Sequence, residues 1–206
     1  MNSTILETKE YMNQKAFSRN SLYFTAVVAI SIWALLAWDY FHGGVPSHHF
    51  LAREEMPAIS NWWGGVLLPL LTWFLLYRIK QKNYDPNEEY AKSPDFLRRE
   101  FWGFLGGLLF GTLLSVLFSL GQTDLAGMLM LGLLMVAFLF PIYRPECLLG
   151  FVLSMTYTFG GVLPTIIGLL LCVIGLVLYG YIRPAVLYLV SKGVLLLSLY
   201  KQKLNS

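Results

Sequence analysis

Residues 147–182 read CLLGFVLSMTYTFGGVLPTIIGLLLCVIGLVLYGYI, and this stretch decides how often the chain crosses a membrane. It contains no Asp, Glu, Lys, Arg or His, and its thirty-six residues exceed the roughly 20 that one helical crossing needs. Gly160 and Gly161 favour a turn, and Pro164 lies where the first turn of a new helix tolerates proline. The stretch therefore predicts two crossings joined by a short turn.

Four further apolar segments precede this stretch, at about residues 22–38, 62–77, 101–120 and 125–142. The chain of 206 residues is 56% hydrophobic and only 13% charged, and its mean hydropathy is +0.59. Such a chain has too little polar surface to cover a water-soluble globule. The expected fold class is an all-α integral membrane protein, a bundle of six transmembrane helices with an interfacial C-terminal helix.

The apolar segment at residues 184–200 is the reason to consider seven crossings. It is about seventeen residues long, at the lower limit for spanning a bilayer. We interpret it as a helix that lies at the inner interface or packs on the bundle, and a seventh crossing is the alternative. The expected organisation is a cytoplasmic segment at residues 1–20, a transmembrane domain at residues 21–183 and this C-terminal helix and tail at residues 184–206.

The charges agree with six crossings. Fourteen of the fifteen Lys and Arg residues then fall on one side of the membrane, and only Arg53 falls on the other. The inner segments carry fourteen basic and eight acidic residues, a net +6, and the outer ones carry one basic and four acidic residues, a net −3. The positive-inside rule therefore predicts cytoplasmic N- and C-termini in a bacterial inner membrane. Attraction to lipid headgroups accounts for the basic loops, so the expected partner is the lipid bilayer and no nucleic acid.

A stripe of small residues on the segment at residues 101–120 predicts close helix packing. The four-residue spacing puts three glycines on one helix face: Gly103, Gly107 and Gly111. Another backbone can approach such a face closely, which replaces the hydrophobic driving force that lipid removes. The partner is a helix of the same chain or of a second copy in a homo-oligomer.

All three histidines of the chain lie in the first outer connector, and they suggest a metal site. Asp39 and His42 are three residues apart at a helix end, and the following glycines and proline turn the chain so that His48 or His49 can approach them. Two or three imidazoles and a carboxylate suit zinc. Zinc lowers the pKa of its bound water, and the hydroxide that forms can attack an ester or amide.

The same connector supplies candidate catalytic groups. Glu54 and Glu55 are available as an acid or base, and Ser60 as an acceptor or nucleophile. Ser60 and Asn61 directly before Trp62 also form an ordinary helix cap. The spacing matches no zinc motif of the HExxH or CxxC type, so a hydrated polar loop and a pH-dependent switch are alternatives.

Two functions follow as hypotheses. The first is a metal-dependent hydrolase or transferase that acts on a lipid-linked substrate at the outer face. The second is a non-enzymatic membrane subunit or an uncoupled permease. Ion-coupled transport is disfavoured because no ionisable residue lies near the middle of a predicted crossing.

Overall fold

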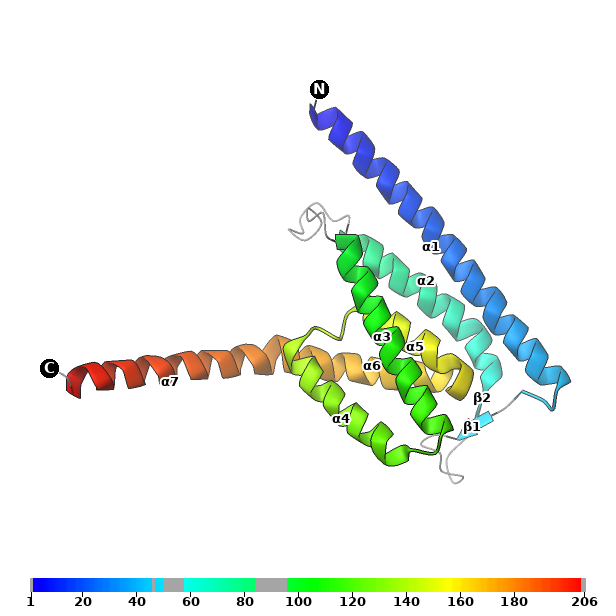
Figure 1. Ribbon diagram of the computed structural model, residues 1–206. Helices are drawn as coiled ribbons and strands as arrows, with labels where there is room; N and C mark the ends of the chain where they lie inside the picture. The colour runs from blue at the N-terminus through cyan, green and yellow to red at the C-terminus, as the bar shows by residue number, and fades with distance from the viewer. Residues whose placement is uncertain (1, 46, 50–57, 84–95, 205–206) are drawn as a thin grey trace.

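The computed structural model describes residues 2–45, 47–49, 58–83 and 96–204. Over these residues the chain is almost entirely helical, with one pair of short antiparallel strands (Figure 1). The expected all-α class is confirmed. The elements in chain order are α1 (Asn2–Phe41), β1 (Ser47–His49), β2 (Ala58–Ser60), the 3₁₀-helix η2 (Asn61–Trp63), α2 (Gly64–Asn83), α3 (Phe96–Ser119), α4 (Thr123–Leu139), α5 (Pro145–Phe159), α6 (Val162–Val177), the π-helix η4 (Leu178–Ile182) and α7 (Arg183–Leu204).

Four helical stretches of the described chain are long and apolar enough to cross a membrane: Met12–Phe41, Asn61–Lys82, Arg98–Ser119 and Val162–Val194. The other two expected crossings are shorter, since α4 has 17 residues and α5 has 15. At about 1.5 Å per residue α5 is about 22 Å long, below the roughly 30 Å of hydrocarbon in a bilayer. The helix lengths support a membrane protein, and they do not by themselves establish six crossings.

The short helix α5 lies at the centre of the fold. It packs against α3, α2 and α6, and eight of its residues are buried. Five of these residues join Leu36 of α1, Leu68 of α2 and Leu114 of α3 in one apolar core: Leu148, Leu149, Phe151, Val152 and Met155. Large apolar side chains such as Trp73 and Leu131 point outward instead, as hydrocarbon solvent allows.

The glycine stripe on α3 faces α5 of the same chain. A Cβ added at Gly107 would strike the carbonyl oxygen of Cys147 at the start of α5. Gly150 of α5 makes the reciprocal contact, because a Cβ there would strike the carbonyl oxygen of Phe104. The two backbones can approach this closely only where side chains are missing, so the α3–α5 contact depends on glycine in both helices. Of the two partners considered for this stripe, the structure shows a helix of the same chain.

The turn predicted between α5 and α6 is confirmed. Gly160 has a φ of +70°, a conformation that favours glycine, and α6 begins at Val162 with Pro164 in its first turn. The glycines that begin α2 lie against this turn, since a Cβ added at Gly64 would be 3.1 Å from the backbone nitrogen of Gly161. Gly64 and Gly161, from distant parts of the chain, thus form one close contact.

The C-terminal helix is continuous with α6 through η4. Figure 1 shows α7 extending away from the other helices, and the side chains of residues 184–194 are exposed. The wider π-helical turn comes just before Pro184, which has no N–H to donate to the helix. A helix at residues 184–200 was expected, and the structure shows it as an extension of α6 rather than as a separate element packed on the bundle.

The α3–α5 contact provides the first testable prediction. Alanine in place of glycine favours a helix by about 1 kcal/mol, but at Gly107 its methyl group would strike the Cys147 carbonyl. We expect Gly107→Ala to destabilise the folded protein by about 1–3 kcal/mol, the usual result of overpacking. The measurement is the unfolding midpoint of the purified protein in detergent.

Gly106→Ala is the matched control, because a Cβ at Gly106 meets nothing within 4 Å. It should leave the midpoint unchanged or raise it. Equal midpoints for the two variants would show that the α3–α5 contact is not as close as described.

Candidate functional site

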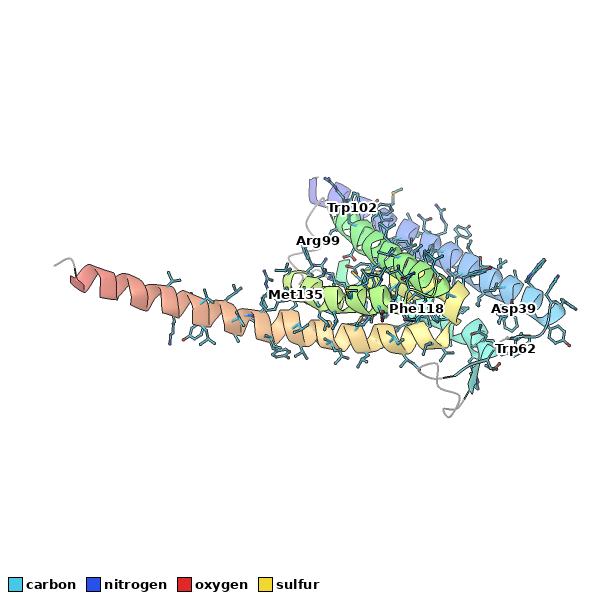
Figure 2. All side chains as sticks on the ribbon, turned by 60° about the horizontal axis from the view of Figure 1, so that its bottom comes forward. Asp39, Trp62, Arg99, Trp102, Phe118 and Met135 are labelled. Atoms are coloured by element: carbon cyan, nitrogen blue, oxygen red, sulfur yellow. The ribbon has the colours of Figure 1, made fainter. Side chains whose placement is uncertain are left out.

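The two ends of the molecule differ in charge. Figure 2 shows Asp39 and Trp62 at one end of the helix bundle, and Arg99 and Trp102 on its opposite side, from which α7 extends away. The first end holds the end of α1, the two strands and the α3–α4 and α5–α6 turns. The second holds the basic end of α2, with Lys80 and Lys82 in its last turn, and the start of α3. We call them the histidine end and the arginine end.

At the histidine end, His42 is held against α1. Its ring stacks on Trp38 with 3.9 Å between ring centroids, and Nδ1 lies 2.9 Å from the Trp38 carbonyl oxygen. A carbonyl oxygen only accepts, so this contact places the ring proton on Nδ1. Nε2 is left with a lone pair that can bind a ligand.

Of the other residues of the predicted metal site, the structure describes only some near His42. Asp39 is three residues from His42, and its carbonyl oxygen accepts hydrogen bonds from the backbone N–H groups of His42 and Gly44, at 3.1 and 2.9 Å. In the strand pair the partners are Ser47 with Ser60, His48 with Ile59, and His49 with Ala58. Glu54 and Glu55 lie outside the described residues, as do the side chains of His48 and His49. Within the part of the chain that the structure describes, no three His, Cys, Asp or Glu side chains come together as metal ligands.

Ser60 has the capping role that its sequence context predicts. It is the N-cap of η2, and its hydroxyl oxygen accepts a hydrogen bond from the backbone N–H of Trp62 at 3.4 Å. Asn61 packs against Gly160 in the α5–α6 turn. These contacts fix the entry of α2 into the bundle.

A large apolar groove opens at the arginine end. Its volume is about 980 Å³, and residues of α3, α4, α5, α6 and η4 line it. Gly106 and Gly132 widen it, because a Cβ at either would meet open space. Arg99 and Arg144 are its only charged lining residues among those described. The groove reaches Phe110, eleven residues along α3 from Arg99, or about 16 Å at the helical rise.

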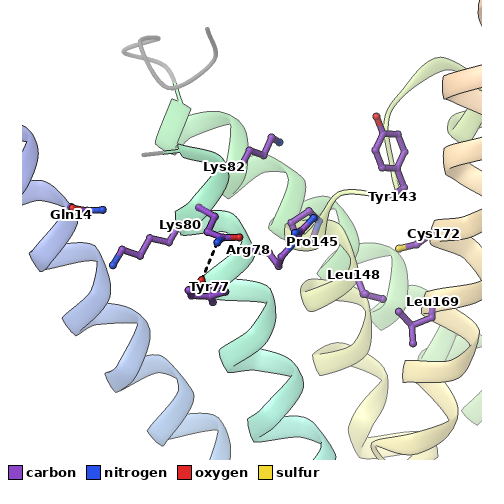
Figure 3. A pocket seen from close by; sticks show the side chains of 11 residues that line it. Gln14, Tyr77, Arg78, Lys80, Lys82, Tyr143, Pro145, Leu148, Leu169 and Cys172 are labelled. Carbon is purple, nitrogen blue, oxygen red and sulfur yellow. Dashed lines mark hydrogen bonds between the residues drawn. The ribbon is translucent and has the colours of Figure 1, made fainter. Parts of the chain in front are cut away.

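A second cavity of about 850 Å³ lies at the same end, between α2, α5 and α6, with Gln14 of α1 (Figure 3). Basic side chains of α2 line it: Arg78, Lys80 and Lys82. The Gln81 side chain donates a hydrogen bond to the Tyr77 hydroxyl at 2.9 Å. Leu148 and Cys172 line both this basic cavity and the groove, so only α5 and α6 side chains separate the two.

Two carboxyl groups are buried beside the groove. Glu146 is 1% exposed and Glu100 is 8% exposed. An Arg144 guanidinium nitrogen lies 3.6 Å from Oε1 of Glu146, and Lys82 Nζ lies 3.7 Å from Oε1 of Glu100. The contact between Arg144 and Glu146 joins two residues that are two positions apart in the sequence. The burial of Glu146 and its proximity to Glu100 are not visible in the sequence.

Burial changes the pKa of Glu146. This residue lies in the first turn of α5, outside the apolar spans. Removal from water disfavours its charged form, and repulsion from the nearby Glu100 carboxylate adds to this effect. Together they raise the pKa of Glu146 above its ordinary value of 4.5. The group therefore holds a proton at pH values where an exposed glutamate does not.

Comparison with protein-family models, curated proteins and solved structures gives no significant match. The function of the chain is therefore argued from its geometry. The strongest chemical feature of the described residues is the arginine end, with its apolar groove, two arginines and two buried carboxyl groups.

Proposed function

We propose that the chain is an integral protein of a bacterial inner membrane, crossed six times with both termini in the cytoplasm. The charge distribution supports this orientation, because the cations of α2 and α3 lie together at the arginine end. α4 and α5 are short for a bilayer, but a bilayer thins around short helices at modest cost. In this orientation the groove opens at the cytoplasmic leaflet.

We propose further that the groove binds an anionic amphiphile, a phospholipid or a lipid-linked substrate. The observation that carries this proposal is the pair of arginines at one end of an apolar groove of about 980 Å³. The apolar walls suit acyl chains, and guanidinium groups hydrogen-bond phosphate oxygens in pairs. Basic pockets between helices on the cytoplasmic side are typical binding places for anionic lipid headgroups.

A second candidate function is the metal-dependent hydrolysis or transfer expected at the histidine end. The geometry of His42 favours it, because metal-binding histidines commonly donate their other ring N–H to a carbonyl group. His42 meets this condition through the Trp38 carbonyl oxygen. The remaining proposed ligands are Asp39, His48 and His49, with Glu54 or Glu55 as acid or base and zinc as the metal.

The groove proposal predicts selective lipid binding. We expect the purified protein to retain phosphatidylglycerol more tightly than phosphatidylcholine, measured by native mass spectrometry. Arg99→Gln with Arg144→Gln should weaken the preference at least about tenfold, since each charged hydrogen bond contributes roughly 1.5–3 kcal/mol. Lys15→Gln with Arg19→Gln removes the same charge from exposed positions of α1 that line neither the groove nor the basic cavity, and should have little effect.

A second pair of variants tests the apolar part of the groove. Gly132→Leu would fill space that the acyl chains need, whereas Gly127→Leu adds the same side chain to α4 where it does not line the groove. Loss of lipid in the first variant alone supports the proposal. Equal retention by all variants would remove it.

The orientation is tested with single cysteines on a chain in which Cys147 and Cys172 are alanine. Gln122→Cys in the α3–α4 turn should react with an impermeant maleimide only from the periplasmic side. Gln81→Cys at the end of α2 should react only from the cytoplasmic side. Both positions are exposed. Reaction of both cysteines from the same side would contradict six crossings in this orientation.

The metal candidate predicts zinc in the purified protein at about one ion per chain, the occupancy of one site. His42→Ala should lose the ion, and Gln122→Ala at the same end should keep it. Elemental analysis of both variants is the measurement. Metal-free wild-type protein, prepared in zinc-containing medium without chelators, would exclude this function.

A further inference from the structure

The buried carboxyl group of Glu146 borders the groove. Gly103 lines the groove, and a Cβ added there would lie 2.7 Å from Cγ and 3.3 Å from Oε1 of Glu146. Arg144 lines the groove as well, and its guanidinium group lies 3.6 Å from the same Oε1 atom. The Glu146 carboxyl group is thus directly behind the arginine end of the groove.

The carboxyl oxygens lack hydrogen-bond donors. Both oxygens of Glu146 and Oε2 of Glu100 have no partner among the described residues. The Lys82 and Arg144 distances of 3.7 and 3.6 Å are too long for hydrogen bonds. An ionised carboxylate can only accept hydrogen bonds, so two neighbouring carboxylates cannot form a hydrogen bond with each other. One proton makes one carboxyl group a donor to the other.

The charged and titratable groups around Glu146 come from each element packed on it. They are Glu100 on α3, Lys82 on α2, Arg144 before α5 and the Cys147 thiol beside it, with Cys172 of α6 near that thiol. Lys82 and Arg144 keep part of their side chains in contact with water, whereas the carboxyl group of Glu146 does not. The cations therefore offset the repulsion between the two carboxyl groups only in part.

We infer that Glu100 and Glu146 form a proton-binding site. Its protonation state determines how strongly Arg144 attracts an anionic headgroup in the groove. This inference rests on the proposed lipid function. With the shared proton bound, the pair carries one negative charge, and Arg144 is free to attract the headgroup. When the proton leaves, the Glu146 carboxylate competes with the headgroup for Arg144.

Infrared spectroscopy tests the proton site without any lipid. Wild-type protein in detergent near neutral pH should show the C=O stretching band of a buried protonated carboxyl group. Glu146→Gln, which has the same shape and a permanent donor, should lose that band. Asp124→Asn, an exposed acid at the histidine end, should keep it. A wild-type spectrum without the band, or a band that survives in Glu146→Gln, would overturn the inference.

The second experiment measures the link to binding. Phosphatidylglycerol affinity of the wild type should fall about tenfold between about pH 5 and about pH 9, corresponding to roughly 1.4 kcal/mol. Glu146→Gln should bind with the acid-form affinity throughout, and Asp124→Asn should follow the wild type.

The outcomes separate the two proposals. A protein that shows no preference for phosphatidylglycerol at any pH would refute the lipid function. A clear preference with the same pH dependence in wild type and Glu146→Gln would leave the lipid function standing and refute the proton link.

Discussion

The close backbone contact between α3 and α5 is the constraint on which the rest of the structure depends. Lipid tails are as apolar as the side chains of the helices. Helices in a bilayer therefore gain little free energy by burying apolar surface against each other, and they associate through close packing. Glycine in both helices allows the Gly107 and Gly150 positions to meet opposing carbonyl groups directly. The contact places α5 at the centre of the fold, where α2 and α6 pack on its other faces.

The same contact creates the arginine end. Because α3 and α5 begin side by side there, Glu100 and Glu146 meet near the first turns of their helices. Gly103 leaves room for the Glu146 side chain, and the absence of a side chain there also keeps the groove wall thin. The groove then opens between this helix pair and α4, with apolar walls and a basic end. One packing interaction thus brings the acids, the arginines and the apolar cavity into one place.

The histidine end is organised by local structure. Gly43 and Gly44, both with positive φ, turn the chain after α1, and the β1–β2 pair returns it to α2. Such turns can be read from glycine positions, which is why the turn after α1 could be predicted. The Ser60 cap could be predicted from the Ser-Asn pair before Trp62, whereas the strand pair was not predicted. The turn at Gly160 was predictable from glycine positions as well. The contact between Gly64 and Gly161 was not, because it joins segments that are distant in sequence.

The sequence by itself determined the helical class, the membrane character and the glycine stripe. Each of these follows from composition or from a period along one helix. Only the tertiary structure decided that α5 is the partner of the stripe, that Glu146 is buried beside Glu100, and that a groove opens at the arginines. These features depend on which helix faces meet, and hydropathy does not encode that choice because large apolar side chains lie on both the buried and the exposed faces of the helices.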